Sequence, residues 1–121
     1  MTGRDADEFC FDLKALSPDP RRDFIATLPK GLSGRGPLFT VLRQALKLPD
    51  YFGGNWDALR DCLRTLDWIN ARRVILVHQD LPRLPPADLA AYLEILSEAV
   101  REWEPTEAHA FRVVFPPGAL G

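Results

Sequence analysis

The sequence is poor in the side chains that most often carry catalysis or hold metal ions. It has two cysteines, Cys10 and Cys62, and two histidines, His78 and His109. The cysteines fit no zinc-ligand spacing, and the histidines fall at a strand end and in a loop, where we interpret them as ordinary polar residues. Glycine-rich phosphate loops and a Gly-x-Ser-x-Gly motif are also absent. We therefore expect no enzyme, no bound metal ion and no cofactor.

Strong net charge and long apolar runs are lacking as well. The formal net charge is −2 over 121 residues, whereas nucleic-acid-binding domains usually carry a basic excess. No apolar run reaches the length of a membrane span, and the first residues lack the apolar region of a signal peptide. A 46% hydrophobic composition suffices for one core. We expect a single-domain, cytoplasmic, monomeric protein that binds neither nucleic acid nor membrane.

Apolar runs and periodicity predict an alternation of strands and helices. Strands are predicted at Phe24–Leu28, Arg73–His78 and Phe111–Phe115, and the unbroken apolar run of the second suits a central strand. Two helices precede the second strand and one follows it. Strands separated by helices imply right-handed crossovers and a small parallel sheet of the α/β class. Loose alternation at Phe9–Leu13 suggests an extra N-terminal edge strand.

The stretch from Leu48 to Leu63 is predicted to form a turn that leads directly into a helix. Pro49 should end any preceding helix, Gly53-Gly54 permits a tight turn, and Asn55 is a good N-cap. The helix has one apolar face, where Cys62 is expected as a buried, reduced thiol. The residues on the opposite face are charged: Asp57, Arg60, Asp61 and Arg64.

Spacing alone leaves the purpose of Asp57 and Asp61 open. They can form an ordinary solvated face, with each aspartate paired to the arginine three residues later. They can also hold a divalent metal in a small enzyme, although no histidine or cysteine lies near them in sequence. The solvated face is the favoured interpretation from spacing. Glu94, Glu98 and Glu102 form a similar acidic ridge on the last helix.

The whole central stretch, Leu-Pro-Asp-Tyr-Phe-Gly-Gly-Asn-Trp-Asp-Ala-Leu-Arg-Asp-Cys-Leu, resembles the signature of the barstar family, the intracellular inhibitors of barnase-type ribonucleases. The resemblance extends more weakly from about Phe24 to Phe115. It implies a three-stranded parallel sheet with helices packed mainly on one side. It also implies that residues 21–121 form the barstar-like domain and that residues 1–20 are an N-terminal extension.

The function that the resemblance implies is occlusion of a ribonuclease active site by the acidic helix and its preceding loop. Asp61 would then lie where the RNA phosphate binds, and Asp57 would be a second acidic contact. Aligning the apolar positions of the last helix places a further acidic contact on Glu98. The implied partner-binding residues are Tyr51, Gly53, Asn55, Trp56, Asp57, Arg60, Asp61 and Glu98.

Three positions depart from the family pattern. Arg60 stands where the best-known member has tryptophan, Trp56 replaces a leucine, and Gly54 replaces a glutamate. A cation at position 60 and a lost acid at position 54 weaken the local negative potential. The partner is therefore expected to be a barnase-like ribonuclease or a related basic toxin, with a barstar-like module for a different basic protein as the alternative.

Overall fold

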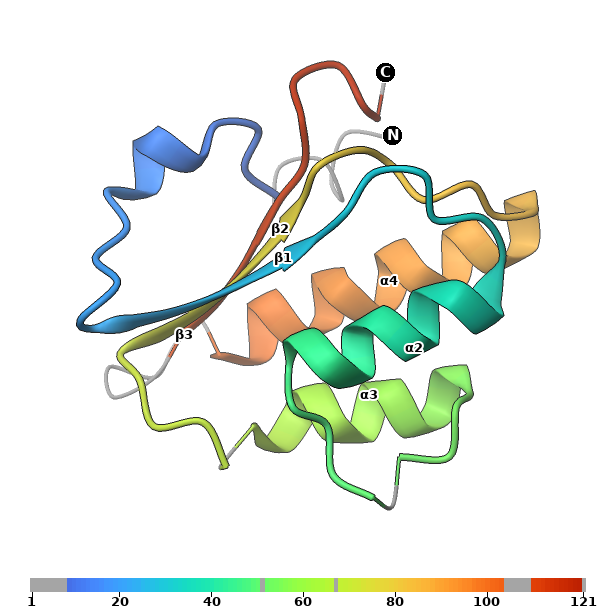
Figure 1. Cartoon of the computed structure of the whole chain (residues 1–121), viewed down its shortest axis with the longest axis horizontal. Helices are drawn as coiled ribbons and strands as arrows, with labels where there is room; N and C mark the ends of the chain where they lie inside the picture. The colour runs from blue at the N-terminus through green and yellow to red at the C-terminus, as the bar shows by residue number, and fades with distance from the viewer. Residues whose placement is uncertain (1–8, 51, 67, 104–109, 121) are drawn as a thin grey trace.

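A computed structural model of the chain describes residues 9–50, 52–66, 68–103 and 110–120 (Figure 1). Tyr51 and His109 lie outside these residues. The elements are, in chain order, η1 (Leu13–Leu16), β1 (Asp23–Leu28), α2 (Arg35–Ala45), α3 (Trp56–Thr65), β2 (Arg73–His78), α4 (Pro86–Trp103) and β3 (Ala110–Val114). The predicted order of strands and helices is confirmed.

The three strands form one parallel sheet in the order β1-β2-β3. Val74 in β2 is opposite Phe24 in β1 and Phe111 in β3. The central strand is the one that was predicted from its apolar run, and burial on both sides explains that composition. The α/β class with a small three-stranded parallel sheet is confirmed.

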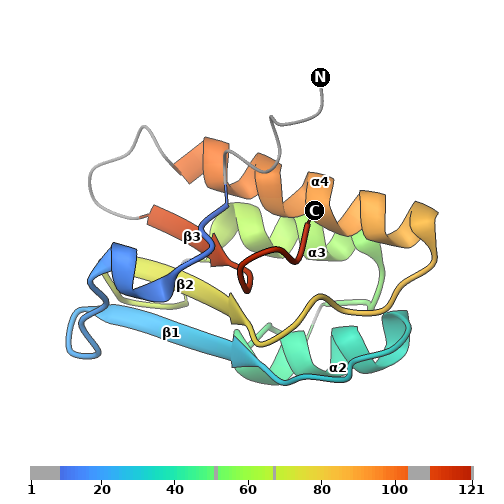
Figure 2. The same ribbon diagram turned by 90° about the horizontal axis from the view of Figure 1, so that it is seen from above.

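The three α-helices cover one face of this sheet, as Figures 1 and 2 show from two directions. Helix α2 contacts β1, α4 contacts β3, and α3 has its main contact with α4. Leu76 and Val113 of the strands are fully buried in the core, together with Leu59 and Leu63 of α3. Because α3 is held through its apolar face, its charged face is left at the surface.

The N-terminal segment crosses the sheet on the side away from the helices (Figure 1). Only Cys10 pairs with the sheet, through a single parallel bridge to Val114 beyond which no strand continues among residues 9–22. The suggested edge strand at Phe9–Leu13 is therefore wrong. Asp12 explains the break, because its side chain accepts a hydrogen bond from the Lys14 amide at 3.0 Å and caps η1 instead.

A buried carboxylate fastens the start of the sheet. The Asp23 side chain is fully buried and accepts hydrogen bonds from the guanidinium groups of Arg72 and Arg73 at 2.9–3.2 Å. The hydrogen bonds from Arg73 lower the pKa of Asp23 well below its usual range, against the opposing effect of burial. Arg73 also donates to the Leu16 carbonyl at 2.8 Å, so the same cluster holds the N-terminal segment against β2.

Candidate functional site

The loop before α3 is anchored by one aromatic ring. The Phe52 amide donates to the Pro49 carbonyl at 2.9 Å, which closes a turn, and the Phe52 ring is buried edge-to-face against Phe39. Gly54 follows with φ +73°, a backbone conformation that favours glycine. With Phe52 held inside, Gly53 and Asn55 lie exposed at the surface.

Helix α3 begins at a well-formed cap. The Asn55 side-chain oxygen accepts a hydrogen bond from the Ala58 amide at 2.8 Å, as the sequence predicts. Cys62 is buried with a free thiol, which confirms the predicted apolar face, and burial raises its pKa. A capped helix with a buried face fixes the positions of the side chains opposite. Asp57 and Asp61 are therefore displayed from a rigid element.

Asp57 and Asp61 are both exposed, but their surroundings differ. The Asp57 side chain is 93% exposed and lies 3.6 Å from Nη1 of Arg60. Within the described part of the chain, no hydrogen bond or ion pair reaches the Asp61 carboxylate. Arg64, the expected partner of Asp61, instead pairs with Glu102 at 3.5 Å. The predicted pairing along the helix thus holds for Asp57 and is wrong for Asp61.

Arg60 connects the charged face of α3 to α4. Its Nε donates to Oε1 of Glu98 at 3.0 Å, and both side chains are about two-thirds buried, with 32% and 31% exposed. The guanidinium thus lies between Glu98 and Asp57 and offsets part of their charge. Two glutamates of the acidic ridge are therefore engaged with α3, and the predicted solvated ridge is partly a helix-to-helix contact.

Trp56 is packed largely against the protein and not displayed at the surface. Its ring packs edge-to-face on Phe39 at 4.8 Å between centroids and lies 5.9 Å from the ring of Tyr92. Its indole N–H donates to the Asp88 carboxylate at 3.3 Å. These contacts fasten the first turn of α3 to α2 and α4, while part of the ring remains exposed.

Sequence reasoning missed the Arg60–Glu98 contact, although a signal for it exists. Arg60 and Arg64 are four residues apart on α3, and Glu98 and Glu102 are four residues apart on α4. Matching spacings of opposite charge on two helices favour a ladder of ion pairs if the helices are neighbours. The sequence does not show that neighbourhood, so the pairing became visible only in the fold.

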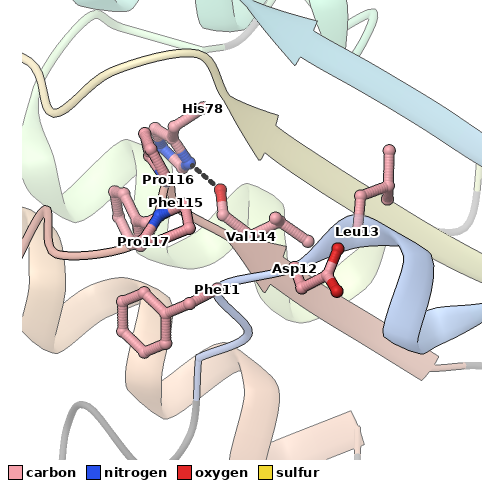
Figure 3. Close-up of a pocket in the computed structure, with 8 residues that line it drawn as sticks. All are labelled: Phe11, Asp12, Leu13, His78, Val114, Phe115, Pro116 and Pro117. Atoms are coloured by element: carbon pink, nitrogen blue, oxygen red, sulfur yellow. Dashed lines mark hydrogen bonds between the residues drawn. The ribbon is translucent and has the colours of Figure 1, made fainter.

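A hollow lies at the carboxyl ends of β2 and β3 (Figure 3). It has a volume of about 290 Å³ and is bordered by Phe11, Asp12 and Leu13 on one side and by residues 114–117 on the other. Its histidine is fully engaged. Nδ1 of His78 is 3.0 Å from the Val114 carbonyl, and Nε2 is 2.6 Å from the Tyr92 hydroxyl.

The partners of His78 define its tautomer. A carbonyl only accepts, so Nδ1 carries the proton and Nε2 accepts from the Tyr92 hydroxyl. The ring is buried and stacks on Phe115 at 4.1 Å, and burial lowers the pKa of His78 to about 4. The interpretation of His78 as an ordinary polar residue is therefore wrong. It is a neutral core residue, and using it as a catalytic base would break a buried hydrogen bond.

The described residues give no indication of a metal centre or a membrane-spanning helix. Among them, no three His, Cys, Asp or Glu side chains are grouped closely enough to hold a metal ion. Within the same part of the chain, none of the helices has the length and apolar character needed to span a membrane.

The fold and the charged face together define a class of small α/β proteins that display an acidic, capped helix beside a three-stranded parallel sheet. The family described as Barstar (barnase inhibitor) matches residues 29–116, which is most of the chain. The protein therefore belongs to the barstar family. No individual curated protein matches it.

Proposed function

We propose that this protein inhibits a barnase-type microbial ribonuclease by placing α3 and the preceding loop in the enzyme's active site. The observation that carries the proposal is the Asp61 carboxylate, which is exposed on a capped helix of a barstar-family chain and has no ion-pair partner among the described residues. A ribonuclease active site binds a phosphate anion and therefore presents cationic donors. A carboxylate held in that position accepts strong, charge-assisted hydrogen bonds from them.

The other proposed contact residues differ in how exposed they are to a partner. Gly53 and Asn55 are exposed in the loop, and Asp57 and Glu98 are joined through Arg60, the residue before Asp61 on α3. Trp56 holds the first turn of α3 in place, and Arg60 is paired with Glu98 and Asp57; neither side chain is fully buried. Tyr51 belongs to the proposed contact set but lies outside the described residues. The proposed complex contains one inhibitor and one enzyme.

The test replaces Asp61 by asparagine, which removes the charge and keeps the shape. We expect the affinity for a secreted guanyl-type ribonuclease to fall by about 2 kcal/mol or more, roughly 30-fold, the lower end for truncated interfacial charge pairs, of which barnase–barstar is the standard example. Calorimetry and cleavage of a fluorogenic RNA measure binding and inhibition.

The matched control is Asp12→Asn, which makes the same charge change at the cap of η1 in the N-terminal segment and preserves a capping side chain. It should leave affinity within a factor of about two, because a distant exposed charge is largely screened by salt. If a panel of such ribonucleases is not inhibited at micromolar wild-type protein, the proposed partner class is wrong. If Asp61→Asn inhibits as well as Asp12→Asn, the proposed contact is wrong.

A second candidate function follows from Arg60. Its pairing with Glu98 and Asp57 leaves this face less negative than its three carboxylates alone would make it, and Gly54 adds no acid. Such a surface also suits a moderately basic protein that is no ribonuclease, for which the chain would be an interaction or immunity module. Affinity capture that returns a basic protein without nuclease activity would favour this alternative.

A further inference from the structure

A pocket of about 330 Å³ lies between α2 and the loop that leads into α3. Gly36, Phe39 and Arg43 of α2 border it on one side, and Phe52 and Gly54 of the loop border it on the other. It is separate from the charged face of α3, yet Gly54 stands directly between two of the proposed contact residues. A partner that covers the loop would therefore reach the edge of this pocket.

The chemistry of the pocket differs from that of the charged face. Phe39 and Phe52 pack edge-to-face, with 5.7 Å between their ring centroids, and form an apolar wall. Gly36 and Gly54 leave space, because an added Cβ at either position would meet no atom within 4 Å. Arg43 is the one charged residue that borders the pocket among the residues described.

The Arg43 side chain is exposed in the last turn of α2. Within the described part of the chain, no ion pair or hydrogen bond reaches its guanidinium. An unpaired guanidinium beside an apolar wall suits a ligand that has an apolar body and a carboxylate. The acidic residues of the proposed contact face, in contrast, would pair with cationic groups of the partner.

We propose that this pocket is a second recognition site for the same partner protein, which packs an apolar side chain against the wall formed by Phe39 and Phe52 and pairs a neighbouring carboxylate with Arg43. The inference rests on the proposed function and adds a requirement to it. A basic active site alone would provide hydrogen-bond donors for Asp61. The pocket adds the requirement that the partner also carries an apolar side chain and a carboxylate beside that active site. Two requirements of opposite charge make the interface selective among basic proteins.

Reversing the charge at Arg43 tests the proposed pair, because long-range electrostatic steering and the local contact would then change the affinity in opposite directions. Arg43→Glu changes the net charge from −2 to −4. Steering by a cationic partner would then strengthen binding, whereas a lost pair and a like-charge contact should weaken it by at least about tenfold. The control is Arg21→Glu, which makes the same change at an exposed position in the turn before β1.

Filling the pocket tests the apolar part independently. Gly36→Leu adds a side chain at the pocket edge where the fold leaves space, and replacing a helical glycine favours the helix. We expect at least about tenfold weaker binding, since a blocked pocket at an interface excludes its anchor, with an unfolding temperature no lower than that of the wild type. Pro37→Leu, on the same turn but outside the pocket, should bind normally.

Calorimetric titration of the same panel of guanyl-type ribonucleases separates the two ideas. Wild-type protein that binds a ribonuclease, with Arg43→Glu and Gly36→Leu both weakened, supports the second site. Wild-type binding with Arg43→Glu as tight as Arg21→Glu, or with Gly36→Leu unaffected, overturns the second site and leaves the proposed function standing. Wild-type protein that binds no ribonuclease overturns both.

Discussion

The neutral histidine in the core should make this protein sensitive to mild acid. His78 has a pKa of about 4 in the folded chain, whereas an unfolded histidine titrates near 6.5. Below pH 6.5 the unfolded state therefore takes up a proton that the folded state refuses. Stability from His78 is fully present above about pH 6.5 and is lost as the pH falls toward 4.

The difference between the two pKa values sets the size of the effect. At 1.36 kcal/mol per pKa unit, the free energy of unfolding should fall by about 2.5 kcal/mol between pH 7.5 and pH 4.5. The cause is burial of the ring, which the hydrogen bond to the Val114 carbonyl and the charge of Asp80 offset only in part. A small domain has about 5–15 kcal/mol of stability in total, so this loss is easily measured.

Urea unfolding followed by tryptophan fluorescence at four pH values between 7.5 and 4.5 provides the assay. The matched control is His78→Gln, which can donate to the Val114 carbonyl and accept from Tyr92 but does not titrate. It should be less stable at pH 7.5 and nearly independent of pH across the window. A wild type whose pH dependence matches that of His78→Gln would refute the reasoning, as would an NMR titration of His78 near pH 6.5.

Two further predictions concern the charged clusters. Asp23→Asn should lower the free energy of unfolding by about 3 kcal/mol in urea titrations, because it leaves Arg73 largely buried without a counter-charge. It should also abolish the loss of stability that the wild type shows as the pH falls below about 4, because the unfolded chain then protonates Asp23 whereas the folded chain, in which the Asp23 pKa is lowered, keeps it ionised. A loss under about 1 kcal/mol, the scale of a surface pair, would contradict the clamp. Arg60→Gln should change stability by less than about 1 kcal/mol, yet tighten binding to a basic ribonuclease and steepen its salt dependence, because Glu98 and Asp57 lose their neutralising cation. Calorimetry at two salt concentrations measures this, and an unchanged salt dependence would contradict it.

The parts of the fold that sequence predicts are those with local causes. The Asn55 cap depends on residues three apart, and the apolar face of α3 depends on a helical period. The central strand is recognisable because burial on both sides demands an unbroken apolar run. Each of these signals lies within about one turn or one strand of the chain, so no knowledge of the fold is needed to interpret it.

One incorrect prediction concerns contacts between distant segments, and another concerns a local hydrogen bond that the apolar pattern does not show. His78 looked polar because its partners, Tyr92 and Val114, are 14 and 36 residues away. Phe9–Leu13 alternates like a strand, but the pattern does not reveal that Asp12 caps a short 3-10 helix instead. His78 was thus assigned by its neighbours in sequence and is determined by its neighbours in space, whereas the break at Asp12 comes from a local hydrogen bond to Lys14 that the alternation does not reveal.

The charge pairing on α3 gives the strongest physical argument about Asp61. A solvated helix face would pair its charges wherever the spacing allows, and Asp57 follows that rule with Arg60. Arg64 lies three residues after Asp61 yet pairs with Glu102 on α4. Asp61 therefore contributes no ion pair within the described chain, and aspartate is a poor helix former in mid-helix. Its replacement by asparagine should leave the free energy of unfolding unchanged within about 0.5 kcal/mol. A loss of inhibition without a loss of stability would assign the Asp61 carboxylate to the partner and not to the fold.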